Sequence, residues 1–130
     1  MAAASILGSS SIVAFVGTRD PARAKVFYRD QLGLPLLRDE QPFALVFDAH
    51  GTMLRVTTVQ ALAAASYTVL GWKIADIAAT VKALESAGVK FERYEGLKDQ
   101  DKLGIWTSPS GAKVAWFKDP DGNVLSVTQF

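Results

Sequence analysis

The chain has 130 residues, 49% of them apolar, which is enough for one domain with a hydrophobic core. Its 14 Lys and Arg nearly balance its 13 Asp and Glu, so the charge gives no indication of nucleic-acid binding. The absence of cysteine and the single histidine, His50, exclude disulfides, thiolate sites, cysteine nucleophiles and sites built on several histidines.

The first segment, residues 1–11, is small and polar and is predicted to be a mobile lead-in. It has no basic region of the kind that opens a secretory signal. No window of the sequence approaches the length of a membrane span. We therefore expect a cytoplasmic protein with neither a membrane nor a nucleic-acid partner.

A strand followed by a helix is predicted twice. Residues 13–20 (VAFVGTRD) and 69–76 (VLGWKIAD) are apolar, and each ends in an aspartate that can cap a helix. The helical patterns that follow place apolar residues on one face and end at a glycine suited to a left-handed cap. The residues that carry these signals are Asp20 and Asp76 for the caps, Ala24, Phe27, Tyr28, Leu32, Ile77, Val81, Leu84 and Ala87 for the faces, and Gly33 and Gly88 for the ends.

Short strands separated by turns follow each helix. The candidates are residues 34–38, 43–48 and 53–58 after the first helix, and 89–94, 104–107, 113–117 and 124–128 after the second. Residues 96–104 form a loop that could cover a ligand. The sequence thus predicts one domain over 12–130, built from module one (12–59), a connector (60–66) and module two (67–130).

Three features of the sequence indicate a known family. These are the paired modules, the segment FYRDQLGL at 27–34, and the segment FKDPDGNVLSV at 117–127. In these features the chain resembles the vicinal oxygen chelate superfamily. This group includes glyoxalase I, extradiol dioxygenases, and bleomycin and fosfomycin resistance proteins. The resemblance covers residues 12–130. Within the superfamily, the chain is similar to a glyoxalase-like subgroup that has no assigned reaction. It implies an α+β fold in which two βαβββ modules curl mixed sheets around a cavity, and it implies a homodimer.

The resemblance also indicates where a metal would be held. In metal-dependent members, four strand positions supply His, Gln or Glu, and here they are occupied by Val13, Arg55, Val69 and Ser126. Valine has no donor atom, and a guanidinium repels a cation. We therefore expect no metal and no other cofactor.

The ligand-binding candidates are residues that strand alternation places toward the cavity, or that flank it. Arg55 is the first of them, because an arginine in an apolar cavity can clamp a carboxylate or phosphate. The alternative is an internal ion pair with Asp48 or Glu92. The other candidates are Phe15, Met53, Trp106, Tyr94 and Ser126, and the aromatic residues Trp116 and Phe43 could also line a pocket or pack in the core. Alternation turns Trp72 toward the helices instead.

Other polar residues are typical of turns and loops. His50 stands in a hairpin turn, Asp99 and Asp101 in a loop, and Ser108 and Ser110 beside a proline. No motif for phosphate binding or for a serine nucleophile is present in the sequence.

Three functions remain open at this point. The first is binding of a small, partly aromatic or anionic molecule without metal, in the manner of resistance proteins that sequester. The second is a lyase, isomerase or dioxygenase-type enzyme with a relocated or metal-free site, for which Glu92, Asp48 or Lys73 would be the base. The third is a partner module with a filled cavity and an exposed apolar patch.

Overall fold

The computed structural model describes residues 6–130, so the first five residues of the predicted lead-in lie outside the described chain. Module one contains β1 (Val13–Thr18), α1 (Pro21–Lys25), the π-helix η1 (Val26–Gln31), β2 (Leu36–Glu40), β3 (Ala44–Ala49) and β4 (Thr52–Thr58). Module two contains β5 (Thr68–Lys73), α2 (Ile77–Ser86), β6 (Trp106–Thr107), β7 (Lys113–Lys118) and β8 (Val124–Gln129). Within residues 6–130, no helix is long and apolar enough to cross a membrane.

Each module forms one four-stranded mixed sheet, with the order β1-β4-β3-β2 in sheet A and β5-β8-β7-β6 in sheet B. The first strand of each module pairs in parallel with its last strand, and the other pairs are antiparallel. The two predicted βαβββ modules are therefore confirmed, and their sheets stay open.

The predicted helix ends are confirmed. The carboxylates of Asp20 and Asp76 each accept a bond from the backbone N–H three residues later, at 3.1 Å. Gly33 and Gly88, at φ of 77° and 95°, end the helices in the left-handed conformation. The first helix differs from the prediction in its second half, which widens to a π-helix, with Leu32 N–H bonded to the Phe27 carbonyl at 2.9 Å.

The predicted strand at 89–94 is wrong. This segment makes one isolated bridge, Phe91 to Phe117, and the Gln100 side chain takes up two of its other backbone groups, the Tyr94 N–H and the Glu92 carbonyl. The Gln100 amide oxygen accepts the Tyr94 N–H at 2.8 Å, and the Arg93 guanidinium donates to the carbonyls of Asp101 and Lys102. These bonds fasten the loop at 96–104 to the segment before it.

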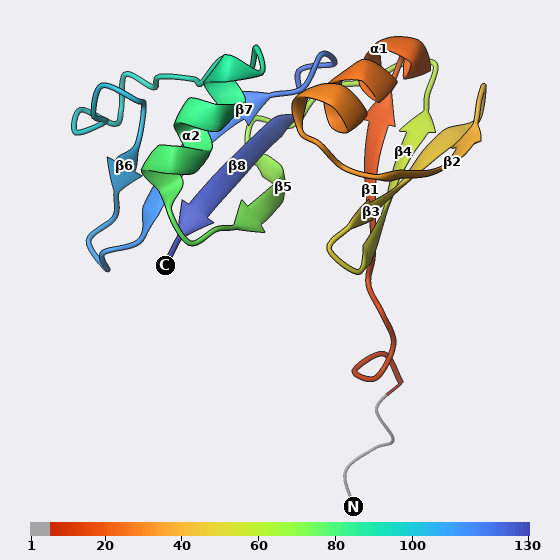
Figure 1. Cartoon of the computed structure of the whole chain (residues 1–130), viewed down its shortest axis with the longest axis horizontal. Helices are drawn as coiled ribbons and strands as arrows, with labels where there is room; N and C mark the ends of the chain where they lie inside the picture. Colours follow the sequence, from red (N-terminus) through yellow and green to blue (C-terminus); the bar gives the residue numbers. More distant parts are fainter. Residues whose placement is uncertain (1–5) are drawn as a thin grey trace, which may run out of the picture.

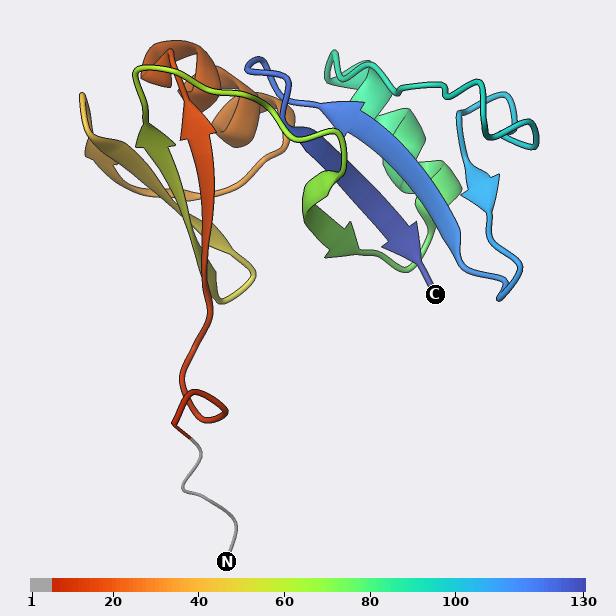
Figure 2. The ribbon, with the colours of Figure 1, turned by 180° about the vertical axis from the view of Figure 1, so that it is seen from behind.

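Both helices lie on the same side of the sheets. Figure 1 shows α1 and α2 in front of the strands, and Figure 2, from behind, shows the strands uncovered by any helix. We call the uncovered side the open face. Strand alternation divides the side chains accordingly, so that alternate residues enter the core on the helix side or lie on the open face.

One core joins the two modules on the helix side. Phe27 of η1 lies 6.4 Å from Phe117 of β7, between ring centroids. The Tyr28 hydroxyl donates to Asp119 Oδ2 at 2.6 Å, although Tyr28 is 0% and Asp119 only 5% exposed. The Asn123 amide donates to the Gly17 carbonyl at 2.9 Å. The segment FKDPDGNVLSV at 117–127 therefore holds module two to β1 and to the FYRDQLGL segment of module one.

The free energy of unfolding should fall at alkaline pH because of the buried hydroxyl of Tyr28. Burial, and then the nearby Asp119 carboxylate, raise the pKa of the Tyr28 hydroxyl far above its ordinary value of 10. Above pH 10 the unfolded chain loses this proton while the folded chain keeps it, so stability present below pH 10 declines by about 1.4 kcal/mol per further pH unit. Urea unfolding at pH 9 to 11 should show this slope in the wild type and a shallower one in Tyr28→Phe. Equal slopes would contradict it.

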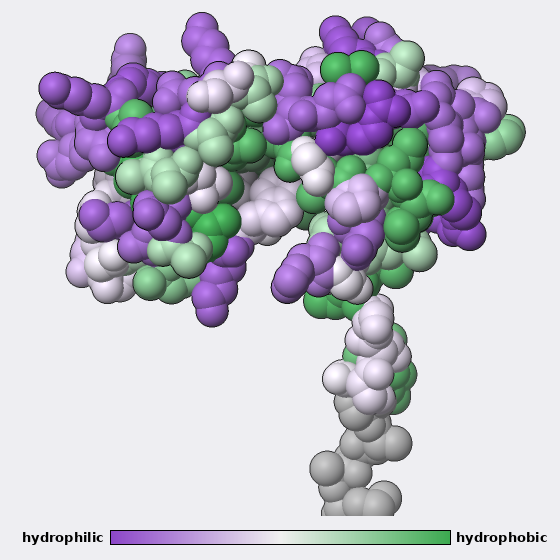
Figure 3. Space-filling view, viewed as in Figure 1, coloured by the Kyte–Doolittle hydropathy of each residue, from purple (hydrophilic) through white to green (hydrophobic). Residues whose placement is uncertain are grey.

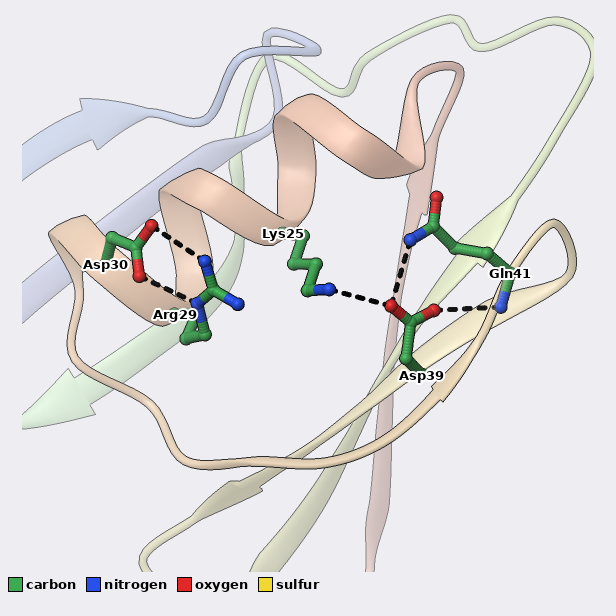
Figure 4. A network of polar contacts seen from close by, with 5 residues as sticks. All are labelled: Lys25, Arg29, Asp30, Asp39 and Gln41. Atoms are coloured by element: carbon green, nitrogen blue, oxygen red, sulfur yellow. Dashed lines mark hydrogen bonds and ion pairs between the residues drawn. The ribbon is translucent and has the colours of Figure 1, made fainter.

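A network of exposed charges ties α1 to β2 (Figure 4). Lys25 Nζ lies 2.8 Å from Asp39 Oδ2, and Asp39 also accepts bonds from the backbone and side chain of Gln41. The hydrogen bond from Lys25 and those from Gln41 lower the pKa of Asp39 to about 2. Arg29 and Asp30 form a second pair at 2.7 Å. Such exposed pairs fix geometry and contribute little to stability.

Candidate functional site

The predicted site residues form two groups, one on the open face of each sheet. On sheet A, Phe15 lies directly across from Arg55 in the β1–β4 register, and Met53 is the next residue on that face of β4. Phe15 is 62% exposed. These three residues give sheet A an apolar edge beside a cation.

Arg55 has an ion-pair partner, but not one of those predicted. Its Nη2 lies 3.2 Å from Glu40 Oε1, and Glu40 is shared with Arg38 at 3.3 Å. The predicted partners are engaged elsewhere, because Asp48 accepts the Gly51 N–H at 2.8 Å and Glu92 faces Lys118. A carboxylate shared by two guanidinium groups leaves this corner of the face with an excess of positive charge.

Three aromatic rings gather on the open face of sheet B. The Trp116 ring lies 5.6 Å from Tyr94, edge to face, and 6.1 Å from Trp106. All three side chains are half-buried. Trp116 is the central member, and sequence reasoning did not separate it from the other aromatic residues. Trp72 is on the opposite side as predicted, stacked on Phe117 at 6.4 Å.

Ser126 lies beside this aromatic cluster with an unused hydroxyl. It is in register with Gly71 on one neighbouring strand and Trp116 on the other, and it is 6% exposed. Among the hydrogen bonds of residues 6–130, none involves the Ser126 hydroxyl. A Cβ added at Gly71 would lie 2.9 Å from Ser126 Oγ, so the glycine leaves the space that the hydroxyl occupies.

A pocket of about 410 Å³ adjoins the aromatic cluster. The connector forms one wall of it and sheet B the other, through Ala64, Ala65, Ser66, Tyr94, Lys118, Gly122 and Val124. Lys118 Nζ lies 3.7 Å from Glu92 Oε1, a long and half-exposed ion pair. Burial and the Glu92 charge raise the pKa of the Tyr94 hydroxyl, which stays a neutral donor. Lys118 was missed from the sequence, although alternation along β7 places it on the face of Trp116.

The donor set at the four family metal positions does not fit a metal ion. Val13 and Val69 are 41% and 39% exposed and have no donor atom. Arg55 is a cation, and Ser126 offers only a neutral hydroxyl. In the described part of the chain, no three His, Asp or Glu side chains gather where they could hold an ion.

The remaining polar candidates lie in turns and loops away from the two groups. His50 is exposed, in the hairpin turn, with a φ of 51°. Asp101 Oδ1 accepts the backbone N–H of Leu103 and of Ile105, each at 2.9 Å. Ser108 and Ser110 bond to each other at 2.8 Å. None of these side chains belongs to the open-face groups.

Comparison with known proteins agrees with this architecture. Residues 11–127 match the family model of the Glyoxalase/Bleomycin resistance protein/Dioxygenase superfamily. No curated protein matches the sequence significantly.

Similar solved structures show the same fold at low sequence identity. They include a lactoylglutathione lyase from Agrobacterium tumefaciens, with 18% identity, a TM-score of 0.70 and coverage of 92% of this chain and 93% of that one. The fosfomycin resistance protein FosX from Listeria monocytogenes has 11% identity, a TM-score of 0.73 and coverage of 94% and 93%. TioX from Micromonospora sp. ML1 has 16% identity, a TM-score of 0.68 and coverage of 92% and 98%. The chain therefore belongs to the glyoxalase/bleomycin resistance/dioxygenase superfamily.

Proposed function

We propose that the protein binds a small, flat, anionic molecule on the open face of sheet B, without a metal ion. The observation that carries this proposal is the Tyr94–Trp116–Trp106 cluster beside the unpartnered hydroxyl of Ser126. Aromatic side chains offer flat apolar surface, and a free hydroxyl fixes the orientation of a ligand. The pocket next to the cluster is large enough for a single- or double-ring compound.

Lys118 supports an anionic ligand. Its ion pair with Glu92 is long, at 3.7 Å, so an anion in the pocket can compete for the ammonium group at small cost. Tyr94 lines the same pocket and keeps a neutral hydroxyl for a second hydrogen bond. On the open face of sheet A, Arg55 is a further cation, shared with Glu40.

A second copy of the chain is the partner that we propose for the open face. Val13, Phe15 and Val69 are exposed on the edge strands β1 and β5, which contact each other. Monomeric proteins seldom leave large apolar patches in water, so we propose that a partner covers these side chains. A homodimer that covers them would also shield the ligand, which agrees with the sequestering role.

The ligand proposal predicts a specific pattern with 2-naphthoate as probe. The indole N–H signals of Trp106 and Trp116 in a two-dimensional NMR titration should shift, and that of Trp72 should not. Trp116→Leu should weaken binding about tenfold or more through loss of the stacking surface. Lys118→Gln should weaken it by roughly two- to fivefold, less at high salt. Lys113→Gln, on the same strand but the other face, is the matched control.

Metal dependence is tested in the same titration. Affinity should be unchanged after treatment with a chelator and after addition of zinc, manganese or nickel. A requirement for one of these ions, or shifts confined to Trp72, would refute the proposal. Light scattering on the same samples should give the mass of two chains.

One observation also favours the enzyme alternative. Glu92 does not line the pocket, but it lies 3.7 Å from Lys118 and near Tyr94, two residues that do, so its carboxylate could accept a proton from a bound molecule. Of the three candidate bases, it is the one that the structure brings to the aromatic cluster. Ligand spectra recorded over time distinguish the functions, because binding leaves the compound unchanged and proton transfer exchanges its hydrogens with deuterium.

A further inference from the structure

A second pocket lies on the helix side, where the two modules meet. It has a volume of about 210 Å³ and is lined by Leu32, Leu34, Trp72, Lys73, Ile74, Thr80, Leu84, Phe117 and Val127. Module one supplies the two leucines after η1, and module two supplies the rest. Figure 3 shows the surface hollowed between the two halves on this side. The pocket is separated from the open face by sheet B.

The walls of this pocket are apolar and incompletely packed. Its floor, Phe117 and Val127, is 1% and 3% exposed, whereas Trp72 and Leu84 above it are only half-buried. The Thr80 hydroxyl is already used, because it donates to the Asp76 carbonyl at 2.9 Å. The walls therefore favour an apolar ligand and provide few groups that could form hydrogen bonds with it.

Lys73 is the charged residue among those that line the pocket, and it forms no ion pair within residues 6–130. Alternation starts the Lys73 side chain on the face opposite to Trp72, but Lys73 is the last residue of the edge strand β5 and lines the pocket, so its flexible stem can carry the ammonium group around the edge to the pocket mouth. A volume of about 210 Å³ equals that of roughly seven liquid waters, which suits a short acyl chain and not a polypeptide segment.

We infer that this pocket binds an aliphatic carboxylate of short to medium chain length, with the chain against Trp72 and the carboxylate on Lys73. The inference does not depend on the proposed function, because the two sites lie on opposite sides of sheet B. A ligand here touches both modules, so it should also hold them together and raise the unfolding temperature.

The test is a titration of the whole protein with butanoate, hexanoate and octanoate, followed through the indole N–H signals. The Trp72 signal should shift, while those of Trp106 and Trp116 stay in place. Affinity should rise about fourfold per added methylene until the pocket is full. Thr80→Phe should fill the pocket and abolish binding, whereas Thr80→Val, close to threonine in size, should leave it intact.

The head group is tested separately with octan-1-ol. Lys73→Gln should weaken octanoate binding by roughly two- to fivefold and leave octanol binding unchanged. Lys118→Gln should affect neither, which separates this site from the one on the open face. Failure of octanoate to shift Trp72, or shifts at Trp106 and Trp116 instead, would overturn the inference. Equal binding by the folded Thr80→Phe protein would do the same.

Discussion

Replacing Asp119 with alanine should lower the free energy of unfolding by about 3–5 kcal/mol, because it removes the acceptor for four buried or half-buried donors. Its Oδ2 accepts the Tyr28 hydroxyl at 2.6 Å and the Asn123 amide at 2.8 Å. Its Oδ1 accepts the N–H groups of Asp121 and Asn123, each at 2.9 Å. The loss would affect both the turn before β8 and the contact between the modules.

Urea unfolding of the variant measures this loss. Tyr28→Phe removes only one of the four bonds and should cost about 1–2 kcal/mol. Asp99→Ala, an exposed carboxylate in the loop, is the control and should change stability by less than about 0.5 kcal/mol. An Asp119→Ala protein that unfolds at the same urea concentration as Asp99→Ala would show that the turn does not join the modules.

Replacing Phe117 with alanine should also cost about 3–5 kcal/mol, through the loss of buried contacts and the cavity left behind. Phe117 is 1% exposed, and its ring contacts rings from three other parts of the chain. These are Phe27 at 6.4 Å, Trp72 at 6.4 Å and Phe91 at 5.3 Å. Because Phe27 belongs to module one, the substitution should again destabilise both modules.

The expected result is one cooperative unfolding transition shifted to lower denaturant, seen equally by tryptophan fluorescence and by circular dichroism. Phe43→Ala is the matched control, since Phe43 is 77% exposed and makes none of these ring contacts. Two separate transitions in Phe117→Ala would contradict the prediction, because they would mean that each module has an independent core.

Much of the fold was predictable because its signals are local. A helix cap depends on one side chain and the next three backbone groups, so Asp20 and Asp76 could be recognised from sequence. A left-handed helix end depends on one glycine. Alternation along a strand assigns faces without knowledge of the neighbouring strands, and it placed Trp72 on the helix side correctly.

The errors occurred where distant groups decide the outcome. The alternating pattern of 89–94 favours a strand, but the Gln100 side chain, which only the folded loop brings within reach, takes up the Tyr94 N–H and the Glu92 carbonyl. The partner of Arg55 was missed for a similar reason. Glu40 lies on β2 and reaches Arg55 of β4 across the intervening strand β3, a strand order that alternation alone does not reveal.

For the candidate site, the sequence indicated which face of the sheet the residues occupy. It did not indicate which of them contact one another. The open face was assigned, and Tyr94, Trp106 and Ser126 do lie together on sheet B. The central position of Trp116 depends on the pairing of β7 with β8 and β6, which sequence reasoning could not give in register. Alternation along β7 gives the face of Lys118, but its place in the pocket depends on the connector, which folds over it through a tertiary contact.

The placement of both helices on one side has a consequence for how such a chain can change over time. The main buried cluster lies on the helix side of the sheets, and Met53, Trp106 and Trp116 on the open face lie outside it. Substitutions at Met53, Trp106 or Trp116 should therefore alter what is recognised while leaving folding almost untouched. A scaffold arranged in this way can diversify its chemistry residue by residue, without a matching rearrangement of its interior.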